Sequence, residues 1–148
     1  MLTDDELIAG FEAATLPAFP HADHVRLTIV YLTRHGREET QRKLFEGLRR
    51  FAGAKGVPEK FHVTMTIAWL DLVDDAMRRH PEARDLSALA MACPELLNRD
   101  ALLRFYTAER LLSDEARQQW VAPDRGLRIE ATNQSNSSAD GLAETERI

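Results

Sequence analysis

The sequence predicts an all-α domain, a compact bundle of about six to eight helices followed by a disordered C-terminal tail. Apolar residues recur at intervals of three and four in several segments, which is the period of an amphipathic helix. Prolines and glycines stand between these segments, where helices commonly begin and end. The chain has 148 residues, 44% hydrophobic and 29% charged, which suits one domain with a genuine core.

The N-terminal segment predicts a short helix and a linker. Thr3 has the character of a helix cap, and Glu6 stands at the position that completes a capping box. The helix is expected to end near Thr15. Residues 16–20 contain two prolines, each of which biases the residue before it away from the helical region. We therefore expect an extended connection there.

Three longer amphipathic helices follow this linker. The apolar spacing predicts helices over residues 23–35, 38–54 and 61–79, and glycines after the first two are suited to end them. The third is expected to be the central, most buried helix. Its first half is rich in β-branched residues, so a strand is an alternative there. These residues are Val63, Thr64, Thr66 and Ile67.

Shorter helices complete the predicted domain. Asp85 can cap a helix that reaches residue 91, and Pro94 can begin a further short piece. One helix is then expected over residues 100–112, and Ser113 can cap a last helix that reaches Trp120. The number of helices is therefore about six to eight.

Composition and charge limit the classes of function. The domain is predicted over residues 1–123, and the polar residues 124–148 are expected to be disordered. The first residues lack the features of a secretory signal, and no long apolar run occurs, so we expect a cytoplasmic protein that does not enter membranes. The formal charge of −5 argues against nucleic-acid binding. The basic stretch over residues 34–60 has interleaved glutamates and is interpreted as a solvated helix face. A homo-oligomer is compatible with the sequence but not indicated by it.

Residues 24–32 and 62–70 share a nine-residue pattern. Both begin with His-Val and have Thr, Ile, an aromatic residue and Leu at the fifth, sixth, eighth and ninth positions. Helical spacing places each histidine and the threonine four residues later on one face. If the intervening helix runs antiparallel, the two histidine helices are parallel and His24 and His62 meet at one end. The pattern therefore predicts a paired-histidine pocket.

The first hypothesis for this pocket is a metal-binding protein or an enzyme. His21, His24, His62 and Glu109 are residue types that bind a divalent metal such as Zn or Fe. Without a metal, His24 and His62 are the candidate catalytic bases, because a helix N-terminus favours a neutral imidazole, and Tyr106 supplies a hydroxyl. Two further side chains are expected nearby: Thr28 and Thr66.

The second hypothesis is a non-catalytic module that binds a small molecule or another protein. In that case the histidines are structural, with His24 and His62 apart or each satisfied by the backbone. Tyr31 and Trp69 lie on the same stripes as aliphatic residues, which is typical of core residues rather than of a ligand site. Whether the chain is an enzyme stays open at this point.

Three segments carry a resemblance to a protein family. They are FPHADHVRL at residues 19–27, FHVTMTIAW at residues 61–69 and FYTAERL at residues 105–111. The chain resembles a family of short uncharacterised bacterial helical proteins over most of its length, up to about Asp124. The resemblance implies a bacterial, cytosolic setting and the boundaries of the domain. It implies no activity.

Overall fold

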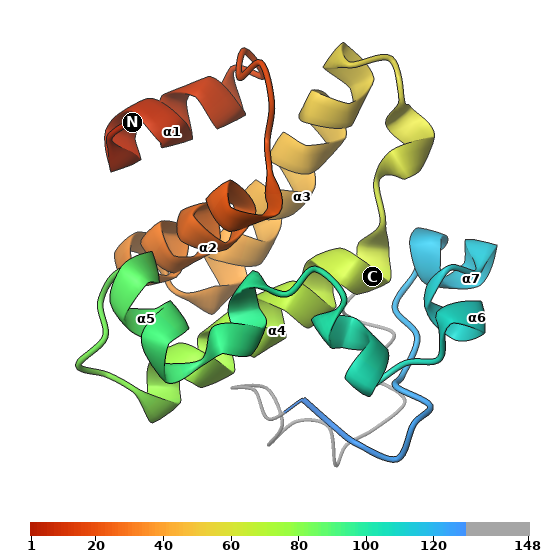
Figure 1. Ribbon diagram of the computed structural model, residues 1–148. Coiled ribbons are helices and arrows are strands. Elements are labelled where there is room, and N and C mark those ends of the chain that lie inside the picture. The colour runs from red at the N-terminus through yellow and green to blue at the C-terminus, as the bar shows by residue number, and fades with distance from the viewer. Residues whose placement is uncertain (130–148) are drawn as a thin grey trace.

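The computed structural model describes residues 1–129, and the rest of the predicted tail, residues 130–148, lies outside this part (Figure 1). Seven α-helices occur in the described chain: α1 (Asp4–Glu12), α2 (His21–His35), α3 (Arg37–Ala54), α4 (Val63–Arg79), α5 (Leu86–Ala92), α6 (Ala108–Leu111) and α7 (Asp114–Gln118). Three short 3₁₀-helices join them: η1 (Pro58–Lys60), η2 (Pro94–Leu97) and η3 (Ala101–Arg104). No strand occurs within residues 1–129, so the predicted all-α bundle is confirmed.

The helices α2, α3 and α4 pack against one another and form the centre of the bundle. Figure 1 shows α2 and α4 running in the same general direction, and α3, which connects them in the chain, running the opposite way. The helix α1 packs on α2 and α3, η2 and α5 pack on α2, and α7 and η3 pack on α4. Among the described helices, none combines the length and apolarity needed to cross a lipid bilayer.

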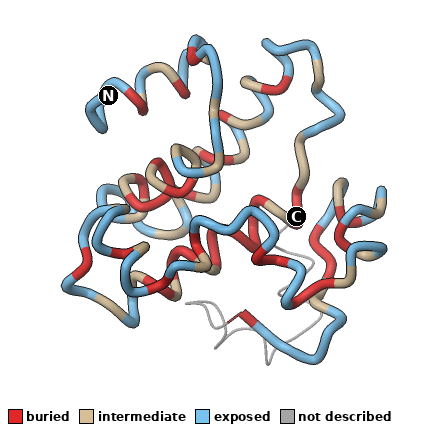
Figure 2. The backbone as a smooth tube through the Cα atoms, viewed as in Figure 1, coloured by how far each residue is buried: buried red, intermediate tan, exposed pale blue. Residues whose placement is uncertain are grey.

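Buried residues form two clusters, and their distribution along the chain is shown in Figure 2. The larger cluster surrounds α4 and includes Ile67, Leu89 and Tyr106. The smaller cluster joins α1 to α2 and α3 and contains Leu7, Phe11, Leu16, Leu27, Tyr31, Leu44 and Leu70. The expectation that the third long helix is the most buried is met, because α4 contributes eleven buried residues. Burial of these apolar surfaces is the main stabilising term of the fold.

Local signals set most helix boundaries. Thr3 and Glu6 form the predicted capping box at the start of α1. Pro20 is the N-cap of α2, so this helix begins at His21, two residues before the predicted start. Gly36 separates α2 from α3 with φ of 80°, a conformation in which a residue with a Cβ is strained. The extended linker between α1 and α2 is also found.

Two expectations for secondary structure are settled by tertiary contacts. The strand alternative at the start of α4 is excluded, since these residues are helical and the Thr64 hydroxyl donates to the Gln119 carbonyl and accepts from the Val121 amide. The single helix predicted over residues 100–112 is wrong. The chain forms η3, breaks, and restarts as α6, because Thr107 is extended and caps α6 while Asp124 binds its amide and hydroxyl.

Residues after Pro123 also contact the helical domain. Asp124 and Arg125 donate their amides to the Phe105 carbonyl, and Ile129 is buried in the larger cluster. These contacts join the segment after Pro123 to η3 and α6. The predicted disorder of residues 130–148 lies outside the described residues.

The Phe11 ring of α1 packs directly against the backbone of α3 at Gly47. A Cβ built at this position would overlap the ring of Phe11, which is fully buried. We expect Gly47→Ala to lower the free energy of unfolding by about 1–3 kcal/mol through overpacking, although alanine favours helix by about 1 kcal/mol. Gly53, in the same helix, has open space around it and is the matched control. Gly53→Ala is expected to stabilise the protein by up to about 1 kcal/mol.

Urea unfolding of the two variants measures this pair of effects. We expect the change in the free energy of unfolding to have opposite signs in the two glycine-to-alanine variants. Of the two glycines, Gly47 faces a side chain of another helix and Gly53 does not. Equal stabilisation by both substitutions would contradict the packing of Phe11 on α3.

Candidate functional site

A pocket of about 860 Å³ opens where the start of α2, the end of α3 and the start of α4 come together. Its walls also include η1 and the residues before η3. The lining side chains are Phe19, Pro20, His21, His24, Leu48, Phe51, Ala52, Lys55, Val57, Lys60, Phe61, His62, Met65, Thr66, Trp69, Arg99 and Asp100. The structure therefore brings the three predicted histidines to one pocket.

His62 is held by the backbone at both ring nitrogens. It is the N-cap of α4, where its Nδ1 accepts a hydrogen bond of 3.0 Å from the Met65 amide. Its Nε2–H donates to the Leu111 carbonyl at 2.8 Å. These partners fix the neutral tautomer, and burial lowers the pKa of His62. Both ring nitrogens of His62 therefore have a backbone partner, which is the arrangement that the second hypothesis describes for one of the two histidines.

His21 is the first residue of α2 and lies against Trp69, with ring centroids 4.4 Å apart. Its Nε2–H donates to the Leu96 carbonyl at 2.8 Å. Burial lowers the pKa of His21, with a smaller effect in the same direction from the nearby Arg99 guanidinium. A neutral imidazole at this position therefore joins η2 to the wall of the pocket.

His24 differs from the other two histidines because its Nε2 atom is buried and has no hydrogen-bond partner among residues 1–129. The ring packs beside Phe19, with centroids 5.5 Å apart. Burial, with a smaller contribution from His21, lowers the pKa of His24 to about 4. His24 is therefore neutral near pH 7, and one polar atom in the pocket wall is left unsatisfied.

The two copies of the nine-residue pattern form the same side-chain-to-backbone hydrogen bond. The Thr28 hydroxyl donates to the His24 carbonyl at 2.8 Å, and the Thr66 hydroxyl donates to the His62 carbonyl at 2.7 Å. Each threonine thus binds the carbonyl four residues earlier. The aromatic positions differ, because Tyr31 is buried in the smaller cluster whereas Trp69 lines the pocket. The two copies therefore agree in local hydrogen bonding but differ in tertiary environment.

Two predicted site residues do not reach the pocket. Tyr106 is fully buried in the larger cluster, and its hydroxyl donates to the Val121 carbonyl at 2.7 Å. Glu109 is exposed in the short helix α6 and is not among the lining residues. Their expected place beside the histidines is corrected accordingly. Their segment packs elsewhere: Tyr106 belongs to the larger cluster, and Glu109 follows the break at Thr107 in α6.

The predicted metal ligands are not assembled as a set. Within residues 1–129, no three His, Cys, Asp or Glu side chains gather in a way that could hold a metal ion. His62 has no free ring nitrogen, and Glu109 lies elsewhere. His21 and His24 are left as two imidazoles, fewer donors than structural zinc sites use.

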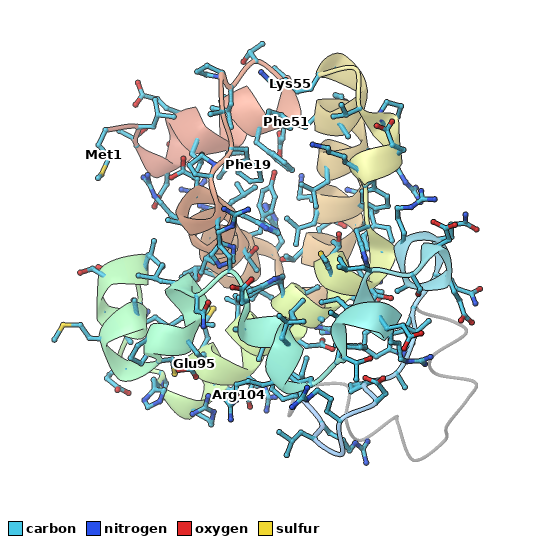
Figure 3. The ribbon with its side chains drawn as sticks, turned by 45° about the vertical axis from the view of Figure 1, so that its right-hand side comes forward. Met1, Phe19, Phe51, Lys55, Glu95 and Arg104 are labelled. Atoms are coloured by element: carbon cyan, nitrogen blue, oxygen red, sulfur yellow. The ribbon has the colours of Figure 1, made fainter. Side chains whose placement is uncertain are left out.

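The sequence reasoning missed the aromatic and cationic side chains that line this pocket. Phe19 and Phe51 lie 5.8 Å apart between centroids, and Figure 3 shows them between the α1–α2 linker and the C-terminal part of α3, with Lys55 close by. Lys55 and Lys60 belong to the basic stretch that was interpreted as a solvated face. The sequence did contain a signal for the aromatic part of this pocket. A phenylalanine stands just before each of the two histidine helices: Phe19 precedes Pro20, and Phe61 precedes His62.

Searches of protein-family models, curated proteins and solved structures find no match to this chain. The resemblance to short bacterial helical proteins therefore stays a prediction, and the site is interpreted from its own geometry.

Proposed function

We propose that this chain is a small-molecule-binding domain whose ligand occupies the pocket between α2, α3 and α4. The observation that carries this proposal is the pocket itself, which combines about 860 Å³ of space with aromatic walls and an unpaired buried imidazole nitrogen. Ligand sites are typically concave, mostly apolar and supplied with a few polar groups. The pocket has each of these properties.

The walls favour a ligand with an apolar body. Besides the three histidines, the described lining includes four aromatic side chains: Phe19, Phe51, Phe61 and Trp69. Binding such a ligand removes apolar surface of both partners from water, which contributes about 25 cal/mol for each Å² buried. The volume falls within the range of about 300–1,000 Å³ that is usual for small-molecule sites.

The state of His24 favours binding over acid–base catalysis. A group with a pKa of about 4 is a weak base near pH 7, because efficient general bases titrate close to the working pH. Its Nε2 is instead a buried hydrogen-bonding atom without a partner among residues 1–129, in a side chain that lines the pocket. Tyr106, the predicted hydroxyl donor, is absent from the pocket wall.

The two tryptophans make a direct test in the wild-type protein. Both belong to the larger cluster, but only Trp69 is among the described residues that line the pocket. We expect a ten-carbon amphiphile, decanoate or decanol, to shift the indole N–H signal of Trp69 in a saturable nuclear magnetic resonance titration. The Trp120 signal is the internal control and is expected to stay in place. A titration that moves neither signal, or only that of Trp120, would contradict the proposed pocket.

Shortening one side chain of the pocket wall tests how much the wall contributes to binding affinity. We expect Phe51→Ala to weaken binding of the same probe by about tenfold, because it removes part of the apolar wall. Leu112→Ala is the control, since Leu112 is exposed and lies outside the pocket. Calorimetric titration measures both affinities, and thermal unfolding checks that each variant is folded.

A further inference from the structure

We propose that the pocket selects an anionic ligand, namely a carboxylate carried on an apolar body. This inference rests on the proposed function and specifies the ligand class of the same pocket. It depends on which charged side chains stand at the pocket and on which of them already have partners.

The charge at the pocket is opposite to that of the whole chain. Lys55, Lys60 and Arg99 line it together with one carboxylate, Asp100, so its formal charge is +2. The whole chain has a formal charge of −5. The three histidines add no positive charge near pH 7, because burial lowers the pKa of each. A local field of this sign attracts anions to the mouth of the pocket.

Two of the cations are available to a ligand. Lys60 and Arg99 are exposed, and neither forms an ion pair within residues 1–129. Lys55 differs, because its Nζ donates to the Pro17 carbonyl at 3.0 Å and lies 5.3 Å from the centre of the Phe51 ring. Lys55 therefore holds the linker to the end of α3, and Lys60 and Arg99 are the side chains that can move to a head group.

The cations and the apolar walls occupy one pocket, and this combination specifies the ligand. Lys60 and Phe61 are neighbours in the sequence and both line the pocket. Arg99 lines it together with His21, whose ring contacts Trp69. A molecule that places its apolar body against Phe61 and Trp69 therefore occupies the pocket that both cations line. A carboxylate meets them with charge-assisted hydrogen bonds. An alcohol of the same length offers only a neutral contact.

The test compares three probes that share one apolar chain: decanoate, decanol and decylammonium. We expect decanoate to bind about tenfold more tightly than decanol, and decylammonium to bind more weakly than decanol, as measured by calorimetric titration. Because Lys60 and Arg99 are exposed, raising the salt concentration is expected to weaken decanoate binding and to leave decanol binding nearly unchanged.

Charge variants separate local selection from the overall charge of the protein. Lys60→Gln with Arg99→Gln is expected to abolish the preference for decanoate over decanol. Arg84→Gln with Arg125→Gln removes the same net charge from two exposed side chains outside this pocket and is expected to keep the preference. Lys60→Arg retains the positive charge and is therefore expected to retain the preference for decanoate.

The outcomes distinguish this inference from the function on which it rests. Decanol binding as tightly as decanoate would overturn the selection for anions and leave the small-molecule pocket in place. A loss of preference in the Arg84 and Arg125 control would also overturn it. If none of the three probes binds saturably, both proposals are overturned.

Discussion

Replacing Arg37 by methionine is expected to lower the free energy of unfolding by about 3–5 kcal/mol, which is the largest single effect that we predict. Arg37 begins α3, and one of its terminal nitrogens lies 2.6 Å from an Asp71 carboxylate oxygen in α4. The exposed fractions are 14% for the arginine side chain and 3% for the aspartate. Removing one partner leaves the other charge buried without its counterion, and this accounts for the large cost.

An exposed arginine of the same helix provides the matched control. Arg42 pairs with Glu39 and Glu46 on the solvent side of α3, with half of its side chain exposed. Arg42→Met is expected to cost less than about 1 kcal/mol, because exposed ion pairs contribute little. Chemical denaturation of both variants measures the difference. Similar small losses in both would show that the Arg37–Asp71 pair is not buried in solution.

The second large effect is a loss of stability as the pH falls from about 6.5 to 4. The pKa of His24 is about 4 in the folded protein and 6.5 in its ordinary state. Between these values the unfolded chain binds a proton that the folded chain does not, so protonation favours unfolding. The contribution of His24 is therefore fully present above pH 6.5 and is lost as the pH falls to 4. The expected loss is about 3 kcal/mol.

The comparison with His24→Leu isolates this contribution. Leucine keeps an apolar side chain in the pocket wall and removes both the titration and the unpaired nitrogen. Urea unfolding at several pH values between 4 and 7.5 is expected to show a shallower decline for the variant than for the wild type. Burial also lowers the pKa of His21 and His62, so some decline persists in the variant. Parallel curves for the two proteins would contradict the burial of His24.

His24 and His62 occupy the same position in the repeated sequence pattern but differ in their surroundings. Both histidines line one pocket, as expected from parallel helices joined by an antiparallel one. Their chemical states differ, because His62 caps α4 and binds the backbone at both nitrogens, whereas His24 lies within α2 with an unpaired Nε2. The local sequence is similar, but the neighbouring elements provide different partners.

The sequence by itself determined the helical class, the capping box at Thr3 and the glycine that separates α2 from α3. These features depend on interactions within a few residues, such as helical periodicity, side-chain caps and backbone conformation. Helical spacing, together with an assumed antiparallel path for the helix between them, also predicted that His24 and His62 meet at one end of the bundle.

Tertiary structure alone decided which side chains share the pocket and in what state. It broke the predicted helix at Thr107, buried Tyr106 elsewhere and brought Arg99 to the pocket that His21 lines. The physical reason is that burial, hydrogen-bond partners and pKa values depend on groups far apart in the chain. Periodicity identifies the face of a helix, but only packing identifies what that face meets.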